Sequence, residues 1–575
     1  MATEPAPSLL PPSFAPSLAP RLTPMLAPLL VVLACRPDTP TSAPAAEERP
    51  SLDQAIAMID EEDLARHVQV LASDAFGGRF PGTAGEAKTL SYISAQLAAA
   101  GIEPAVSGGF TQEVPLQRSL VDPSARITLT GPGGSPLVLA WGDDFLAGSG
   151  RGEAQVTIGD AQVVFAGYGI VAPEYAWDDY AGIDVKGKLV VVLGGEPSSD
   201  DNTLFEGRAL THHGTRTGKM KTAAALGAAA LLTLRADGEN GIAWSTLANG
   251  AKAPKYAIAA GKDEVAAQAH GILLESSAKR ALALAGADLD ELRSAAEERG
   301  FRARALDLRA SIDLATEIRP ELSHNIVGLL RGRKRPDEYV VYTAHWDHVG
   351  IREHLEGDSI FNGAVDNATG ISALLELAQA YGSLDSAPER SVVFIATTAE
   401  EQGLLGSFYY TAHPVFPLER TMGVVNIDAL FPFGAFEGMT VVAQGSSDMD
   451  AYLDRAAHAV GRTTHPDPAP EHGAFFRSDH YPFALKGVPA LFAVGGPSPD
   501  TPMDEQVIAR FQDYMVNRYH QPADEYDAST WDMAGIRQDV EIFFRLGVDL
   551  ANSTDVPNWR ADHAFRAKRD AMLAL

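Results

Sequence analysis

Cysteine is almost absent from this chain, because Cys35 is the only one among 575 residues. A single cysteine cannot form an intrachain disulfide and cannot build a zinc module of the cysteine-rich kind. Any metal that the protein holds must therefore be bound by histidine and carboxylate side chains.

Basic residues are scarce relative to acidic ones. Lys and Arg number 46 against 75 Asp and Glu, which gives a formal net charge of -29. This charge repels phosphate backbones, so we do not expect nucleic acid as a partner. A hydrophobic share of 46% with 21% charged residues is typical of a globular chain. The length exceeds one ordinary compact domain and indicates two folded units.

The apolar run at residues 26–34 is too short to span a bilayer but suits the core of a signal peptide. It ends at Cys35 in a sequence that resembles a bacterial lipoprotein cleavage box, although Leu33 is bulky where a small residue is usual. We expect residues 1–35 to be a signal peptide, of the lipoprotein or the ordinary secretory type, and residues 36–50 a flexible linker. The protein would then be a periplasmic or cell-envelope lipoprotein attached through Cys35, or a secreted protein. A disordered leader with a chance cysteine is the alternative.

The pattern changes twice along the rest of the chain. Helical spacing of apolar residues begins at residue 51, where we expect folded structure to start. From residue 125 to about 200, short alternating strands separated by Gly and Asp turns replace it, which indicates a domain boundary. The predicted elements of this middle region are strands 154–158, 163–166, 188–193 and 229–234, and helices 220–227 and 282–299.

After residue 338 apolar strands alternate with helices. The strands show no polar alternation, so both of their faces are expected to be buried. This pattern predicts an α/β fold with a mixed, mostly parallel sheet sandwiched by helices. The predicted strands are 339–344, 391–397, 422–427 and 490–494, and the helices are 371–381 and 404–412.

Polar side chains follow three of these strands directly. His345 and Asp347 follow the first strand, Glu400 and Glu401 the second, and Asp428 the third. Each has an ordinary structural explanation: a hydrogen-bonded pair, favourable charge before a helix, or a turn residue. Together they bring an imidazole and carboxylates to one rim of the sheet, where ligands bind in such folds. These are the ligand types that suit divalent metals.

Asp366 stands before the predicted helix 371–381, and an N-cap would be a sufficient explanation for it alone. However, the ordered set of segments around these residues resembles the M28 family of metallopeptidases, over nearly the whole chain from Ser51. The resemblance implies the zinc-peptidase, phosphorylase-like fold. The segments are AHWDHVG, AVDNATG, AEEQGLLGS, VNIDAL, RSDHYPF and YHQPADEYD.

The resemblance also implies a ligand set for two Zn²⁺ ions per chain. His345, Asp366 and Asp428 would hold one zinc ion, and Asp366, Glu401 and His520 the other. Asp366 would bridge the two ions.

Three further roles follow from the resemblance. Glu400 would be the general base, which takes the proton of the attacking water and passes it to the leaving amine. Asp347 would accept a hydrogen bond from His345 and fix its tautomer. Tyr519 would hydrogen-bond the oxyanion, although a tyrosine there could equally pack beneath the site.

Other histidines could compete with this ligand set. His348 follows His345 by three residues, but we expect it to support the ligands or to be exposed. His480 rivals His520, and we prefer His520 because its surrounding segment matches the ligand motif.

An insert at residues 135–312 resembles a protease-associated (PA) domain, on residues 163–198 and 219–234. It would divide the peptidase domain into residues 51–134 and 313–575. A role as a lid over the site and a purely structural role both remain open.

We expect a metallo-aminopeptidase that hydrolyses the N-terminal residue from peptides. A carboxypeptidase or dipeptidase is the alternative, because Arg477 beside the site could bind a substrate carboxylate. A single-zinc glutaminyl cyclase is disfavoured by the complete ligand set. A non-catalytic binding member of the fold would need lost ligands. The oligomeric state is not defined by the sequence.

Overall fold

The computed structural model describes residues 51–197, 201, 203–239, 242–259, 265–499 and 504–574. The predicted signal peptide, Cys35 and the linker lie outside the described residues. Within these ranges, no helix has the length and apolar character needed to cross a membrane.

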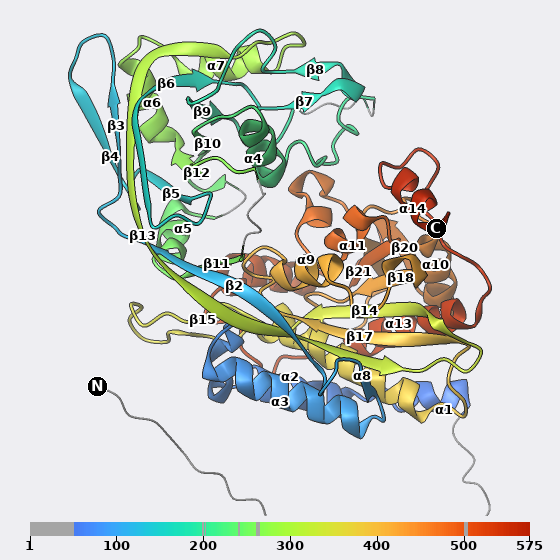
Figure 1. Ribbon diagram of the computed structural model, residues 1–575. Coiled ribbons are helices and arrows are strands. Elements are labelled where there is room, and N and C mark those ends of the chain that lie inside the picture. Colours follow the sequence, from blue (N-terminus) through green and yellow to red (C-terminus); the bar gives the residue numbers. More distant parts are fainter. Residues whose placement is uncertain are drawn as a thin grey trace, which may run out of the picture. The chain divides into compact units, whose positions relative to one another are not determined.

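The larger sheet carries parallel strands at its centre, as predicted (Figure 1). The strands β17, β14, β18 and β21 are parallel, and antiparallel pairs extend the sheet on both sides. In spatial order the strands are β11 (Lys255–Ile258), β2 (Thr111–Val121), β13 (Arg304–Leu330), β17 (Arg390–Thr397), β14 (Arg335–His345), β18 (Thr421–Asn426), β21 (Ala490–Gly496), β19 (Gly438–Val441) and β20 (Thr463–Pro466), with the short β1 (Glu103–Pro104) also on β13.

The central strands are buried on both faces, which explains their unbroken apolar sequences. Val340 and Tyr342 of β14 pack into one core, and Tyr339 and Val341 pack into the other. On the first face lie α2 (Glu61–Leu71), α3 (Ala84–Ala99), α8 (Thr369–Ser383), α10 (Met449–Ala459) and α13 (Ala534–Asn552). The opposite face packs against α9 (Leu405–Ala412) and α11 (His480–Lys486) (Figure 1). Shorter helices are α1 (Leu52–Ile56), α12 (Glu505–Asp513) and α14 (Arg566–Leu573).

The middle region has a hydrophobic core of its own, built from residues between Ala125 and Leu314. Its sheet runs in the order β4 (Pro136–Ala140), β3 (Arg126–Thr130), β13, β6 (Gln155–Phe165), β9 (Leu189–Val192), β10 (Ala230–Arg235), β12 (Ala269–Leu274) and β5 (Phe145–Ser149). Its helices are α4 (Arg216–Ala225), α5 (Trp244–Ala251), α6 (Glu275–Ala283) and α7 (Leu289–Ala296).

The insert boundaries differ from the predicted residues 135 and 312. Residue 135 falls between β3 and β4, which pair as a hairpin, so the insert begins before β3. Residue 312 lies inside β13, a continuous strand that pairs with β6 of the insert and with β2 and β17 of the larger sheet. A composition shift could not locate this boundary, because one strand belongs to both sheets.

Two predicted elements of the insert were also wrong in detail. The expected helix 282–299 is split between α6 and α7, because Gly286 takes a positive φ of 64° and Asp288 caps α7 through the amides of Asp290 and Glu291. Strands 154–158 and 163–166 form the single strand β6.

Candidate metal centre

Three parallel strands end at the same edge of the sheet and deliver the polar residues found there. His345 is the last residue of β14 and pairs in register with Thr397, the last residue of β17. β18 ends beside them at Asn426, two residues before Asp428. Glu400 and Glu401 stand in the loop between β17 and α9.

Asp366 lies in the irregular turn Ala364–Ala368 that leads into α8, and it is not the cap of that helix. The neighbouring Asn367 performs the capping function, because its side-chain oxygen accepts from the amide of Gly370 at 2.9 Å. Asn367 also donates to the carbonyl of Ile427 at 3.0 Å, which ties this turn to the end of β18. The Asp366 carboxylate therefore remains available to the site.

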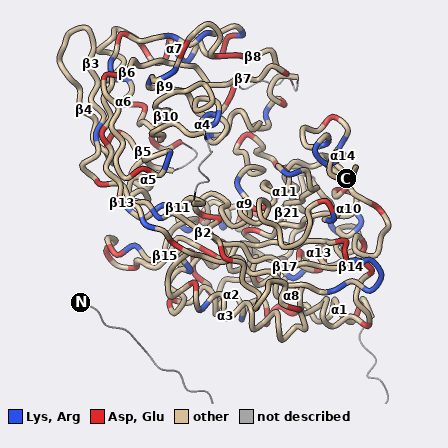
Figure 2. The backbone as a smooth tube through the Cα atoms, viewed as in Figure 1, with Lys and Arg blue, Asp and Glu red and all other residues tan. Residues whose placement is uncertain are grey.

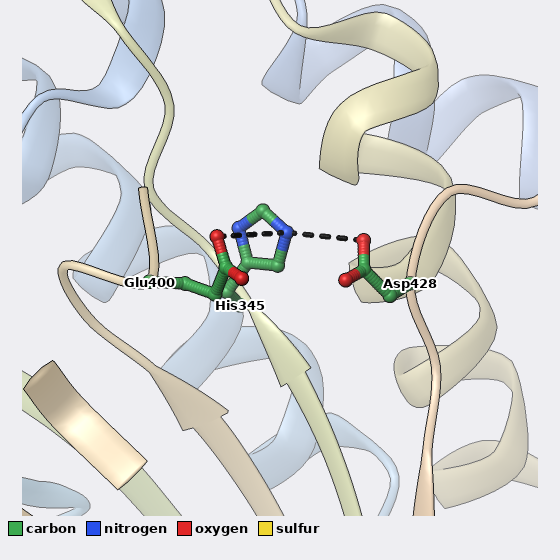
Figure 3. A group of neighbouring side chains, drawn as sticks. All are labelled: His345, Glu400 and Asp428. Atoms are coloured by element: carbon green, nitrogen blue, oxygen red, sulfur yellow. Dashed lines mark hydrogen bonds and ion pairs between the residues drawn. The ribbon is translucent and has the colours of Figure 1, made fainter. Parts of the chain in front are cut away.

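The first predicted ligand group converges in the structure. His345 Nε2 lies 3.2 Å from Asp366 Oδ1 and 3.2 Å from Asp428 Oδ1. Glu400 Oε2 is more distant, at 4.0 Å from the same nitrogen. Figure 3 shows the Glu400 and Asp428 carboxylates on opposite sides of the His345 ring.

The second predicted group shares Asp366 with the first. His520 Nε2 lies 3.1 Å from Asp366 Oδ2 and 3.0 Å from Glu401 Oε2. Each oxygen of Asp366 thus faces a different imidazole, which is the arrangement expected of a bridging carboxylate.

Two other sets of side chains also have potential ligand atoms within 4.8 Å of one another: His345 with Glu400 and Asp428, and His348 with Asp366 and Glu401. His348 is fully buried, and its Nδ1 lies 2.6 Å from Glu401 Oε1, the oxygen that does not face His520. This contact makes His348 a support for Glu401, but His348, Asp366 and Glu401 also form a group that could hold a metal ion, so the supporting role of His348 stays a prediction. His480 packs between Phe475 and Phe492, away from these groups.

The adjacent glutamates differ in their electrostatic surroundings. Burial raises the pKa of Glu400 well above its usual range, and the charges of Asp428 and Glu401 act in the same direction. Burial would also raise the pKa of Glu401, but the neighbouring His520 and His348 lower it to about 2. Glu401 is therefore suited to be a permanently charged ligand, and Glu400 to exchange a proton.

Asp347 does not make the side-chain hydrogen bond to His345 that we expected. Its carboxylate lies 3.9 Å from His345 Nδ1, and its backbone carbonyl makes the closer contact at 3.1 Å. The carboxylate instead accepts from the backbone amides of Glu400 at 3.0 Å and Glu401 at 3.4 Å. Asp347 thus holds the glutamate loop against the end of β14.

Tyr519 stacks on the ring of His520, with 3.9 Å between ring centroids. Its hydroxyl accepts a hydrogen bond from Arg477 Nη2 at 3.2 Å. The hydroxyl proton of Tyr519 remains available to a bound group, and Arg477 is engaged with the tyrosine.

Several supporting contacts were missed by sequence reasoning. Ser478 donates to Asp428 Oδ2 at 2.5 Å and accepts from Asn426 Nδ2 at 2.6 Å, which leaves Oδ1 of Asp428 to face His345. Asp524 accepts from the amides of Val365 and Asp366 at 3.0 and 3.2 Å. Both residues lie in segments already singled out, RSDHYPF and YHQPADEYD, but their partners are distant in sequence.

Arg79 was missed because nothing in its Gly-rich surroundings indicates a role. Its fully buried guanidinium donates to the backbone carbonyls of Trp346, Asn362 and Gly363 at 2.9, 2.6 and 2.8 Å, and to that of Leu71. It therefore joins the segment after β14 to the turn that carries Asp366.

The charge balance of the centre fits divalent cations. Asp366, Glu400, Glu401 and Asp428 have side chains between 5% and 14% exposed. Among the described residues, no lysine or arginine forms an ion pair with any of the four. Four mostly buried carboxylates whose ion-pair partners among the described residues are all imidazoles are costly, and bound cations would remove that cost.

Comparison with known proteins points to one family. Residues 325–544 match peptidase family M28, a range that contains all five predicted ligands. Over 159 residues the chain is 31% identical to aminopeptidase NAALADL1 of Mus musculus, covering 27% of this chain and 19% of that protein. Over 127 residues it is 29% identical to a glutamate carboxypeptidase 2 homolog of Caenorhabditis elegans, covering 21% of this chain and 15% of that protein. The chain thus spans less than a fifth of either relative's length.

Among solved structures, the chain is similar to an aminopeptidase from Aneurinibacillus sp. strain AM-1. The alignment has a TM-score of 0.50 and 20% sequence identity, and it covers 89% of this chain and 99% of that one. At this identity the likeness shows a shared fold.

The Ser478 contact leads to a prediction about metal affinity. Replacing Ser478 with Ala should weaken zinc binding by about 10- to 100-fold, because Asp428 loses the hydrogen bond that orients it. Competition titration against a chromogenic chelator measures this, and Ser478→Thr should restore most of the affinity. Ser372→Ala is the matched control, since Ser372 is equally buried but donates to the carbonyl of Leu64. An unchanged affinity in Ser478→Ala would show that the contact is incidental.

Proposed function

We propose that this chain, which contains a domain of peptidase family M28, is a dizinc metallo-aminopeptidase that removes the N-terminal residue from peptides. One observation carries the proposal: the two oxygens of Asp366 face His345 and His520, and each imidazole lies near a further carboxylate. The aminopeptidases among the similar proteins support the reaction class.

Zinc ions held by these groups would lower the pKa of a water molecule and polarise the scissile carbonyl. Glu400 would act on that water; two observations support this role, since its carboxylate lies no closer than 4.0 Å to His345 Nε2 and burial raises its pKa. Its carboxylate takes the proton of the attacking water and then gives it to the leaving amine. Glu401, between His348 and His520, is held as a ligand.

Tyr519 stabilises the negative oxygen that develops on the scissile carbonyl. Its hydroxyl accepts from Arg477, so the positive charge of Arg477 makes it a stronger donor to that oxygen. In this proposal Arg477 acts through Tyr519.

A carboxypeptidase or dipeptidase is the second candidate, favoured by the carboxypeptidase homolog among the relatives and by the position of Arg477. For the insert we propose the PA domain assignment, which rests on the sequence resemblance. Export with lipidation of Cys35 likewise remains a prediction.

The bridging position of Asp366 predicts a metal stoichiometry. The purified protein should bind two zinc ions per chain, and Asp366→Ala should lose both, because each predicted ligand group includes that carboxylate. Metal analysis after dialysis measures the ratio. One ion in the metal-replete wild type, or two retained in the variant, would contradict the bridged arrangement.

Replacing each of the two adjacent glutamates should give a different phenotype. Glu400→Gln should retain metal and lose about 100-fold or more in kcat, the range expected on removing a general base. Glu401→Gln should lose metal. Each variant is the control for the other in a combined kinetic and metal analysis, and reversed results would mean that the two roles are exchanged.

Blocking the substrate's N-terminus should abolish cleavage, because the acidic centre favours a free amine. The comparison is between peptides with free and acetylated N-termini, with mass spectrometry locating the bond that is cut. Cleavage of acetylated peptides from their C-terminal end, lost in Arg477→Ala, would establish the carboxypeptidase instead.

A further inference from the structure

Arg352 lies near the metal centre but has no role in it. Its side chain is 8% exposed and rests over two aromatic rings, 5.4 Å from the centroid of Phe80 and 5.9 Å from that of Phe361. Among the residues that the structure describes, its guanidinium makes no hydrogen bond or ion pair. A mostly buried cation without a hydrogen-bond or ion-pair partner is costly, even in a chain with a net charge of -29. A bound anion would remove that cost.

The structure connects Arg352 to the glutamate loop. It follows the short strand β15 (Gly350–Ile351), which comes soon after His348 in the chain. Phe80 packs against Tyr256 with tilted rings whose centroids are 5.3 Å apart, and the backbone amide of Tyr256 donates to Gln402 Oε1 at 3.3 Å. Gln402 directly follows Glu401, so the rings of Phe80 and Tyr256 lie on the Glu401 side of the metal centre.

Lys255 adds a second cation at the same place. It is the first residue of β11, next to Tyr256, and its side chain is exposed; Figure 2 marks basic positions in and next to β11. Lys255 adjoins Tyr256, whose backbone amide bonds to Gln402, and the charge of Glu401 partly offsets the burial that lowers the pKa of Arg352. The two cations and Glu401 therefore share one neighbourhood.

We propose that Arg352 and Lys255 bind a substrate carboxylate on the leaving-group side of the scissile bond, so that the enzyme prefers short peptides such as di- and tripeptides. The proposal rests on the aminopeptidase function given above. The guanidinium, which lies over two rings, presents a planar fork that matches a carboxylate. The amine of a short peptide would be drawn to the acidic centre, and its carboxylate would then reach the cations beside the Glu401–Gln402 loop. An acidic side chain has the same chemistry and is the other possible source.

The test compares three peptides: leucyl-glycyl-glycine, its C-terminal amide, and leucyl-glutamyl-glycinamide. The wild type should hydrolyse the free acid with a higher kcat/KM than the amide. In Arg352→Gln and in Lys255→Gln the ratio of the two values should fall, by about 10- to 100-fold for the arginine, the range expected on losing a charged hydrogen bond. A preference for the glutamyl amide over the plain amide, lost in the same variants, would assign the site to an acidic side chain.

Lys252→Gln is the matched control. Lys252 is exposed, lies three residues before Lys255 and bonds to Asn249, so its loss changes the net charge equally without touching the site. If Arg352→Gln does not fold, the result for Lys255→Gln tests the proposal, because an exposed side chain can be replaced without disturbing the fold. Equal kcat/KM for acid and amide in the wild type, or an unchanged ratio in both variants, would overturn the proposal.

A separate measurement distinguishes this proposal from the aminopeptidase function on which it rests. Wild-type hydrolysis of leucine p-nitroanilide, which has no carboxylate, tests the function alone. Calorimetric binding of leucyl-glycyl-glycine and its amide to Glu400→Gln, with and without Arg352→Gln, tests the carboxylate site without turnover. Tighter binding of the free acid that disappears with Arg352 supports the site, and equal binding of acid and amide refutes it.

Discussion

The parallel register of β17, β14 and β18 is the constraint on which the metal centre depends. Backbone hydrogen bonds align His345 with Thr397 and place Asn426 alongside, so the residues that follow each strand emerge at one edge. A slip of one residue would turn each side chain to the opposite face and separate the ligands. Because both faces of these strands are packed, the two cores fix the register that the chemistry requires.

The strand register brings carboxylates together at the metal centre, and hydrogen bonds from neighbouring groups hold the surrounding backbone against their repulsion. Four carboxylates with little exposure repel one another, and among the described residues no lysine or arginine forms an ion pair with any of them. It instead holds the backbone: Arg79 binds carbonyls, Asp347 and Asp524 bind amides, and Asn367 ties a turn to a strand end. The loops therefore keep their shape while the charge of the centre stays unbalanced and able to attract cations.

The sequence predicted those parts that depend on local pattern. Unbroken apolar strands indicated burial on both faces, and the polar residues after them were brought together as expected. Contacts between distant segments left no such pattern: Ser478 with Asp428, Asp524 with the Asp366 turn, and Arg79 with four carbonyls. The capping role shifted from Asp366 to Asn367 because only the three-dimensional turn decides which side chain reaches the amide of Gly370.

The continuous strand β13 has a consequence for the order in which the protein folds. β2 finds its main partner in the second half of β13, after the whole insert has been synthesised. Until then β2 has an open edge, and such edges are templates for pairing with other chains. Pairing over so long a sequence separation is also slow, since loop closure must precede any gain. An insert that collapses early around its own core would bring the ends of this loop together, and so act as an internal folding aid for the larger sheet.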